Sequence, residues 1–269
     1  MSPREASGRR FARPLVTAGL LAAALLGSPR ARAQDAGPPI GWSGEIRTEP
    51  SAVRIEGRDV SWWYNHAEVQ YRAENKDIVY LGGETQTRDD VTNGMVILGG
   101  YAHRGDWYYF AEGRAGIDPT FLYQISLEAQ AGRLFHHTLV SLDYRFLEFK
   151  TTDVHLGTAA ATQSFGWGEV EARLAYGENM TLGKPIRMAL LRGLWFATPQ
   201  LWIGAGAAVG TRLFDVVAIQ LAQENGWTAF ANASYQWTDR DRIRIDFGYS
   251  RENPSFRQVG GALSYRRRF

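Results

Sequence analysis

The chain has 269 residues, with 30 Lys and Arg, 28 Asp and Glu, no cysteine, 45% hydrophobic residues and 13% aromatic residues. The absence of cysteine excludes disulfide frameworks, Cys-ligated zinc, thiol nucleophiles and a lipidated N-terminal cysteine. The first 33 residues hold six basic groups and one acid, which leaves 24 basic and 27 acidic groups and a net charge of −3. A nucleic-acid partner is therefore not expected.

Residues 1–33 have the three-part form of a secretory signal peptide. A basic stretch, Met1 to Pro14, precedes the apolar run from Leu15 to Gly27, and small residues follow at Ala31 and Ala33. The apolar run is too short to span a bilayer, which takes about 20 residues. We therefore expect cleavage after Ala33 and export, and no later run is long and apolar enough for a transmembrane helix.

Apolar and polar residues alternate in most of the chain after residue 60. In residues 107–117, aromatic and small residues alternate with Glu112 and Arg114, and in residues 121–131 the apolar face begins with Phe121 and Tyr123. The same period of two, which is typical of strands with one apolar face, recurs at 140–146, 170–176, 201–209, 227–237 and 243–249.

The length and the two faces of these runs favour strands that cross a membrane. The runs have about ten residues, longer than the five or six of most soluble strands and close to the length of a tilted spanning strand. Aromatic residues near the ends of the apolar faces fit two membrane interfaces, and charges on the other faces fit a wet lumen. A spanning sheet must close on itself. We predict an all-β fold, an antiparallel transmembrane β-barrel.

The strand count and the turns follow from the same pattern. Thirteen strands are predicted from Ser61 onward, but an outer-membrane barrel normally has an even number, with both chain ends in the periplasm. Residues 42–55 could supply a fourteenth strand, or weak segments near Ile78 and Met95 could leave twelve, and we favour fourteen. Residues 34–59 are then a periplasmic leader with a possible first strand, and 60–269 the barrel.

The spacing of the turns predicts which of them share an end of the barrel. Turn sequences occur at 117–120, 197–200 and 238–241, with longer gaps at 177–184 and 213–226. We expect both longer gaps at one end of the sheet and the tight turns at 198–199 and 239–240 at the other, as in barrels with short periplasmic turns.

The last strand ends in Phe269, with Val259, Leu263 and Tyr265 on the same face. A terminal phenylalanine after an alternating strand resembles the end of bacterial outer-membrane barrels that the barrel-assembly machinery recognises. The resemblance implies that Tyr265 and Phe269 form an assembly signal. Arg267 departs from the pattern, in which the third residue from the end is apolar or aromatic.

A second resemblance lies in the middle of the chain. The sequences Leu-Asp-Tyr-Arg-Phe-Leu-Glu-Phe at 142–149, Asp-Val-His-Leu-Gly-Thr at 153–158 and Gly-Glu-Val-Glu-Ala-Arg-Leu-Ala-Tyr at 168–176 are similar to the YaiO family of outer-membrane barrels. The resemblance implies a protein of the outer membrane of a Gram-negative bacterium, in contact with its lipids, lipopolysaccharide and the barrel-assembly machinery. Some members of the family occur in a setting of surface polysaccharide handling, so a surface polysaccharide or a small solute is a further candidate partner.

The polar faces of the strands define the candidate lumen residues. Interleaved acids and bases can cross-link a narrow lumen by ion pairs. The pattern is therefore compatible with a closed barrel and with a pore. In a pore, inward arginines late in the chain, including Arg266, favour anionic solutes. The candidate lumen residues are Glu112, Arg114, Glu128, Asp143, Arg145, Glu169, Glu171, Arg173, Arg192, Arg212, Arg244 and Asp246, of which Arg192 has an ambiguous face.

Residues that could carry catalysis do not form a convincing set. His137 and Ser141 share a strand face but stand about 13 Å apart, too far for proton transfer. Asp153 and His155 share a face without a nucleophile opposite them. The histidines show no metal-ligand spacing, and the glycines at 204, 206 and 210 lie inside a predicted strand, where they give space or a bend. We expect no catalytic residues, metal or cofactor.

Three functions are compatible with these observations. The first is a non-enzymatic, porin-like outer-membrane barrel in transport, envelope integrity or surface polysaccharide handling. The second is a lipid-modifying barrel enzyme, an acyl hydrolase or transferase, which needs a serine, a histidine and an acid on the outward face. The third is a soluble secreted sandwich or barrel that binds a ligand, which requires the apolar faces of 227–237 and 243–249 to point inward.

Overall fold

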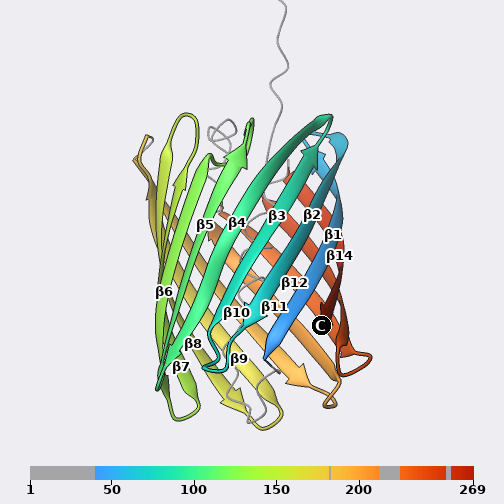
Figure 1. The fold of residues 1–269 in the computed structure, drawn as a ribbon. Coiled ribbons are helices and arrows are strands. Elements are labelled where there is room, and N and C mark those ends of the chain that lie inside the picture. The colour runs from blue at the N-terminus through green and yellow to red at the C-terminus, as the bar shows by residue number, and fades with distance from the viewer. Residues whose placement is uncertain (1–39, 182, 212–224, 253–255) are drawn as a thin grey trace, which may run out of the picture.

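The computed structural model describes residues 40–181, 183–211, 225–252 and 256–269, which form one closed barrel of antiparallel strands (Figure 1). Each strand pairs with its neighbours in sequence, and β1 pairs with β14 to close the sheet. Within these ranges, no helix is long and apolar enough to cross a membrane. The strands are β1 (Gly41–Ile55), β2 (Arg58–Arg72), β3 (Ile78–Arg88), β4 (Val91–Arg104), β5 (Trp107–Ile117), β6 (Ile125–Phe135), β7 (Thr138–Glu148), β8 (Asp153–Phe165), β9 (Gly168–Asn179), β10 (Lys184–Phe196), β11 (Leu201–Thr211), β12 (Asn225–Gln236), β13 (Asp241–Glu252) and β14 (Phe256–Arg268).

The prediction of a fourteen-stranded antiparallel barrel is confirmed. Residues 42–55 supply the additional strand, because β1 pairs along its length with both β2 and β14. The segments near Ile78 and Met95, which looked weak in the sequence, are the strands β3 and β4. The expected signal peptide, residues 1–33, lies outside the described residues.

The two ends of the barrel differ in their turns. Phe269 donates its backbone N–H to the carbonyl of Trp42 at 2.9 Å, so both ends of the described chain meet at one end, here called the terminus end, which is the lower end in Figure 1. The connections at 197–200 and 237–240 also lie there, and the facing ends of β9 and β10 and of β11 and β12 lie at the opposite end, the loop end. Residues 212–224, which make up most of the predicted gap at 213–226, lie outside the described residues. The predicted separation of these turns is confirmed.

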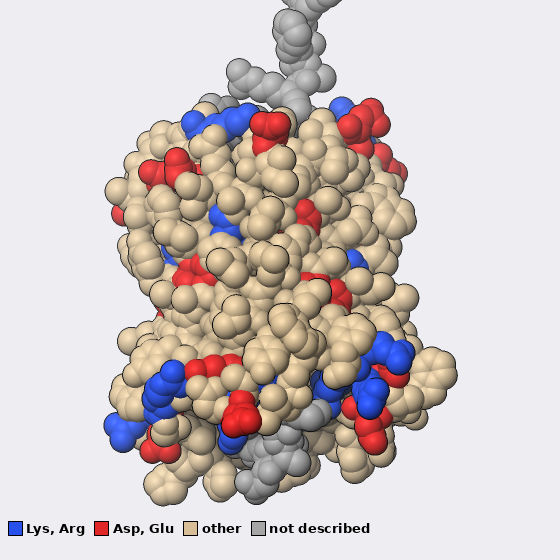
Figure 2. Space-filling model, in the orientation of Figure 1, with Lys and Arg blue, Asp and Glu red and all other residues tan. Residues whose placement is uncertain are grey.

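The outer face of the barrel is apolar. Leucine, valine, isoleucine and alanine side chains point outward along the middle of the strands, and rings lie towards both ends. Charged side chains gather near the two ends, with a mainly uncharged band between them (Figure 2). The outward rings include Trp42, Trp107, Trp195 and Trp237 towards the terminus end and Trp63, Tyr176 and Trp227 towards the loop end.

The exposure of side chains on β12 and β13 also tests the third function considered above, a soluble ligand binder. That function requires the apolar faces of 227–237 and 243–249 to point inward. Trp227, Tyr235 and Trp237 are exposed, and so are Ile245 and Phe247 on β13. The aromatic faces of β12 and β13 therefore point away from the barrel interior, which contradicts the soluble alternative.

On the inner face, aromatic rings lie over glycines of the neighbouring strand. A Cβ atom at Gly132 would overlap the ring of Tyr108, and one at Gly99 would overlap the ring of Tyr80. Tyr80 also packs in a buried cluster with Ile78, Ile97, Tyr101 and Phe110. The glycines therefore let large rings lie flat against the inner wall of β3 to β6.

The start of β6 differs from the prediction. The alternating pattern placed Phe121 and Tyr123 on the outward face of a strand, but β6 begins at Ile125, and Phe121, Leu122 and Tyr123 are all buried. Residues 118–124 form a loop whose apolar side chains turn inward. Outward strand faces and buried loop residues are both apolar, so hydrophobicity alone could not distinguish them.

Candidate functional site

The inner wall carries several groups of ion-paired side chains, and the first lies on β2 to β5. Arg114 donates from Nε to Glu112 at 2.6 Å and from Nη1 to Glu84 at 3.1 Å. The hydroxyl of Tyr64 donates to Glu84 at 3.0 Å, and that of Tyr80 donates to Glu112 at 2.6 Å. Each carboxylate is thus held by the same arginine and by one tyrosine, an arrangement of charge-assisted hydrogen bonds that fixes the side chains on the wall.

Two more groups follow around the barrel. Arg145 on β7 pairs with Glu128 on β6, next to Asp143, whose buried Oδ2 has no hydrogen-bond partner. Further around, Glu171 on β9 accepts hydrogen bonds from Arg173 at 2.6 Å, Arg192 at 3.1 Å and Thr162 at 2.9 Å. Arg192, whose face was ambiguous in the sequence, therefore lies on the inner wall.

The last group joins β13 and β14 to β1. Asp246 accepts from Arg244 at 2.8 Å and from Arg47 at 2.9 Å, and Arg47 also donates to Glu49 at 3.0 Å. In the next pair along, Arg266 donates from Nε to Glu45 at 2.6 Å. These ion pairs link the strands that close the barrel.

The structure places the predicted lumen residues of the described ranges on one side of the sheet. Glu112, Arg114, Glu128, Asp143, Arg145, Glu169, Glu171, Arg173, Arg192, Arg244 and Asp246 are buried or half-buried and face away from the exposed apolar side chains. Arg212 lies outside the described residues.

Sequence reasoning missed the partners that β1, β2 and β3 contribute. These are Glu45, Arg47 and Glu49 on β1, Tyr64 on β2, and Glu84 on β3. The signal was present in β1, where Glu45, Arg47 and Glu49 are spaced two residues apart, as expected for one strand face. This spacing alone does not identify a strand, because the sequence around it alternates less regularly than the later strands and contains Pro50.

The loop between β5 and β6 is fixed inside the barrel by one side chain. Asn93 on β4 is 1% exposed, and its Oδ1 accepts the backbone N–H groups of Thr120 and Phe121 at 2.9 Å and of Leu122 at 3.2 Å. The guanidinium of Arg88 lies 4.4 Å from the centre of the Phe121 ring. Three backbone donors that would otherwise be unsatisfied are therefore paired, which offsets the cost of burying the loop.

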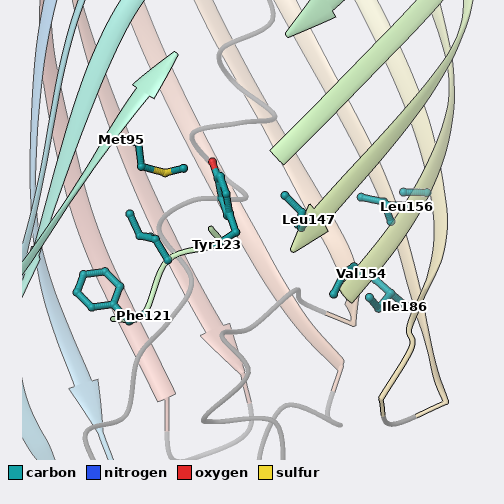
Figure 3. Close-up of a cluster of buried hydrophobic side chains, with 9 residues drawn as sticks. Met95, Phe121, Tyr123, Leu147, Val154, Leu156 and Ile186 are labelled. Atoms are coloured by element: carbon teal, nitrogen blue, oxygen red, sulfur yellow. The ribbon is translucent and has the colours of Figure 1, made fainter. Parts of the chain in front are cut away.

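An apolar cluster surrounds this loop at the loop end. Met95, Phe121 and Tyr123 approach one another from β4 and the loop, and residues from β7, β8 and β10 extend the cluster (Figure 3). Arg114 donates to the hydroxyl of Tyr123 at 3.4 Å, which joins the cluster to the charged wall. The interior is thus charged at mid-height and apolar where the loop enters. The buried members of the cluster are Met95, Phe121, Leu122, Tyr123, Leu147, Val154, Leu156, Ala175 and Ile186.

The residues weighed for catalysis lie apart. Ser141 is buried on the inner face and accepts a hydrogen bond from Gln130 at 3.2 Å, while His137 lies in the β6–β7 turn. On the outer face, Nδ1 of His155 forms a hydrogen bond with the hydroxyl of Tyr144 at 2.5 Å. The partner of this ring nitrogen is therefore Tyr144 and not Asp153. Among the residues that the structure describes, no three His, Asp or Glu side chains are placed to hold a metal ion.

The two residues of the expected assembly signal differ in their surroundings. Tyr265 is half-buried on the outer face and donates its hydroxyl hydrogen bond to Asp241 at 2.5 Å. Phe269 has a side chain that is 74% exposed and is held by its backbone N–H. The terminal ring is thus available at the terminus end of the barrel.

A closed antiparallel barrel with an apolar outer face, rings near both ends and a charged inner wall defines the class of outer-membrane β-barrels. The fold is similar to that of the CymD monoaromatic hydrocarbon channel, with a TM-score of 0.59, 9% identity, and coverage of 86% of this chain and 89% of that one. It is also similar to a bacterial polysaccharide outer-membrane secretin, with a TM-score of 0.53, 10% identity, and coverage of 84% and 98%.

A third similar structure is the outer-membrane protein Omp33 of Acinetobacter baumannii, with a TM-score of 0.50, 13% identity, and coverage of 86% of this chain and 99% of that one. At these identities the likeness concerns the fold alone. No protein-family model matches the chain, and a search of curated proteins gives no match.

Proposed function

We propose that the protein is an outer-membrane channel for small solutes. The observation that carries the proposal is the partial exposure of ion-paired side chains on the inner wall, where Arg266 is 31% exposed, Arg244 30% and Glu45 23%. Barrels of about 8 strands are filled by side chains, whereas barrels of about 16–18 strands leave an aqueous channel. Fourteen strands give more interior than side chains fill, and exposed charges fit a wall in contact with water.

The loop between β5 and β6 sets the size limit of this channel. Asn93 and the apolar cluster hold Phe121, Leu122 and Tyr123 inside the loop end, where they reduce the cross-section on the side of β4 to β8. The channel therefore admits smaller solutes than a barrel of this strand number without an inward loop.

The outer face and the two chain ends support the location and the route of assembly. The apolar outer face with rings near both ends fits a bilayer. Residues 1–33 direct export, and the barrel-assembly machinery reads Tyr265 and Phe269. Outer-membrane lipids and lipopolysaccharide then surround the barrel.

Planar-bilayer recordings test the proposal. Protein that shifts its migration on boiling, as folded barrels do, should give discrete conductance steps. Replacing residues 121–123 with Gly-Ser-Gly should raise the step size, because the inward side chains are removed. Val91→Ser, at the exposed first residue of β4 at the same end, should leave the step unchanged. Folded protein that conducts neither with nor without the loop side chains would refute a channel.

The resemblance to the YaiO family, carried by residues 142–149 and 168–176, adds surface polysaccharide handling as a second candidate. The same recordings separate the two functions. A polysaccharide that occupies the barrel should block conductance at concentrations where an uncharged polymer of equal size does not. Equal block by both polymers would argue against a polysaccharide-specific role.

A further inference from the structure

Three arginines converge on the inner face at the terminus end, and we call Arg72, Arg266 and Arg268 the basic mouth. Arg72 ends β2, and Arg266 and Arg268 end β14, with only β1 between these strands. Ser43 on β1 lies directly opposite Arg268, and Gly41 lies opposite Arg72. All three arginines are half-buried, and both Arg266 and Arg268 act electrostatically on Arg72.

The negative charge near the basic mouth does not match its positive charge. Glu45 pairs with Arg266, and Arg268 donates to the backbone carbonyl of Asp239 at 3.4 Å and is also attracted by the Asp239 carboxylate. Two carboxylates therefore lie near three guanidinium groups. Arg72 makes no ion pair with any described residue. Its neighbours in register along the inner face are uncharged, since Ile78 lies opposite Arg72, then Tyr101, then Phe110.

Neighbouring strands add to this positive charge. Arg242 lies directly opposite Arg266 in the β13–β14 pairing and shares its inward face. Arg242 is held by stacking on Trp202, with 4.1 Å from its guanidinium to the ring centre, and by a hydrogen bond to Gln236 at 3.1 Å.

We propose that the basic mouth is an anion-binding site at the terminus-end entrance of the barrel, which takes small solutes that carry a carboxylate or phosphate group. Guanidinium groups bind both oxyanions in bidentate geometry, and half-burial strengthens the attraction relative to bulk water. Because the three arginines face the interior, the anion reaches them from solution and not from the surrounding lipid. The role of the site in solute passage rests on the proposed channel function, whereas anion binding by the three arginines does not depend on it.

The ion selectivity of the reconstituted protein tests the site. In a potassium chloride gradient the reversal potential should show preference for chloride. The double variant Arg72→Gln/Arg268→Gln should lower the chloride-to-potassium permeability ratio roughly two- to fivefold, since two fixed charges at the entrance are lost. Arg133→Gln is the matched control, because Arg133 lies at the same end but on the outer face, stacked on Trp107 and Phe135.

Anion binding is measured separately, so that the site and the channel can fail independently. Protein folded in a phosphate-free detergent should melt at a higher temperature in millimolar inorganic phosphate or benzoate, because a ligand of the folded state stabilises it. The double variant should lose this rise, and Arg133→Gln should keep it. A wild type that binds anions without conducting would refute the channel and support the site. A folded double variant with unchanged selectivity and an unchanged anion-dependent melting temperature would overturn the site.

Discussion

The ring of Tyr108 over Gly132 leaves no room for a side chain on the inner face. Alanine in a strand is ordinarily better than glycine by about 0.5–1 kcal/mol. At this position the added Cβ would overlap the ring, and overpacking of this kind costs about 1–3 kcal/mol. We expect Gly132→Ala to lower the free energy of unfolding, measured by urea titration in lipid.

The control is Gly248→Ala on β13, where no other atom lies within 4 Å of the added Cβ. This variant should be neutral or slightly more stable than the wild type. Equal stability of both alanine variants would show that the ring of Tyr108 moves away freely.

At the terminus end, Asp77 in the β2–β3 turn makes a pH-dependent contribution to the stability of the folded protein. Hydrogen bonds from Arg104, at 2.9 and 3.1 Å, and from the backbone N–H of His103, at 2.9 Å, lower the pKa of the Asp77 carboxyl below its ordinary value. The stabilisation is therefore complete above the unfolded pKa of about 3.9 and is lost as the pH falls through the lower folded pKa.

Asp77→Asn should lower the midpoint of thermal unfolding at pH 7 by about 1–2 °C, as expected of an exposed ion pair. The difference from the wild type should disappear at a pH below the folded pKa. Asp106→Asn, in the next turn at the same end, is the control, since its carboxylate accepts no hydrogen bond from the residues described. A difference for Asp77→Asn that persists at low pH would contradict the assigned role of the charge.

At the scale of single residues, strand parity predicted much of the inner wall. Glu112 and Arg114 on one strand, and Glu169, Glu171 and Arg173 on another, share a face in the sequence and in the structure. Which acid meets which base could not be predicted, because this depends on the register between strands. Arg47 meets Asp246 from the opposite end of the chain, and no local pattern links the two residues.

At the scale of elements, the loop between β5 and β6 depends on a single acceptor. Asn93→Ala would leave the N–H groups of Thr120, Phe121 and Leu122 without their acceptor, and each buried donor left unpaired costs about 1–3 kcal/mol. We expect the barrel to stay closed and the loop to leave the interior. Limited proteolysis should then cut within residues 118–124, at positions protected in the wild type.

Asn93→Asp is the matched variant, because it keeps the accepting oxygen. The Nδ2 atom of Asn93 has no hydrogen-bond partner, so the loss of the amide removes no contact there, and a carboxylate that accepts several backbone N–H groups is favoured as an anion. This variant should protect the loop better than alanine does. If both variants were cut equally, the apolar side chains of the loop alone would hold it.

The same loop marks the limit of sequence patterns at this scale. A period of two identified the strands because each strand has one apolar face. Residues 121–123 are also apolar, but they are held inside the barrel by hydrogen bonds to Asn93, which lies on the preceding hairpin. A contact between residues this far apart in sequence does not show in the alternation of apolar and polar residues. The pattern therefore assigned them to the following strand.

At the scale of the whole molecule, the closure of the sheet into a barrel was predictable from the sequence, but the pairing of β1 with β14 that closes it was not. A sheet in a bilayer cannot leave an edge unpaired, so a closed barrel followed from the strand pattern, and the even number followed from the expectation that both chain ends lie on one side of the membrane. The first strand is the least regular, with Thr48, Pro50 and Arg54 on its outer face, and it was identified only by the requirement for an even number. In the structure it pairs with β14 from Ser43 to Ile55.

The terminal ring permits a test that separates assembly from stability. Because the Phe269 side chain is largely exposed and the backbone N–H makes the bond to Trp42, Phe269→Ala should change the free energy of unfolding by only about 0.5 kcal/mol or less. If the barrel-assembly machinery reads this ring, the amount of protein in the outer membrane should fall severalfold. Heat-shift electrophoresis of that fraction measures it, with Trp237→Ala, an exposed ring at the same end, as the control. Normal amounts of the Phe269 variant would assign recognition to the rest of β14.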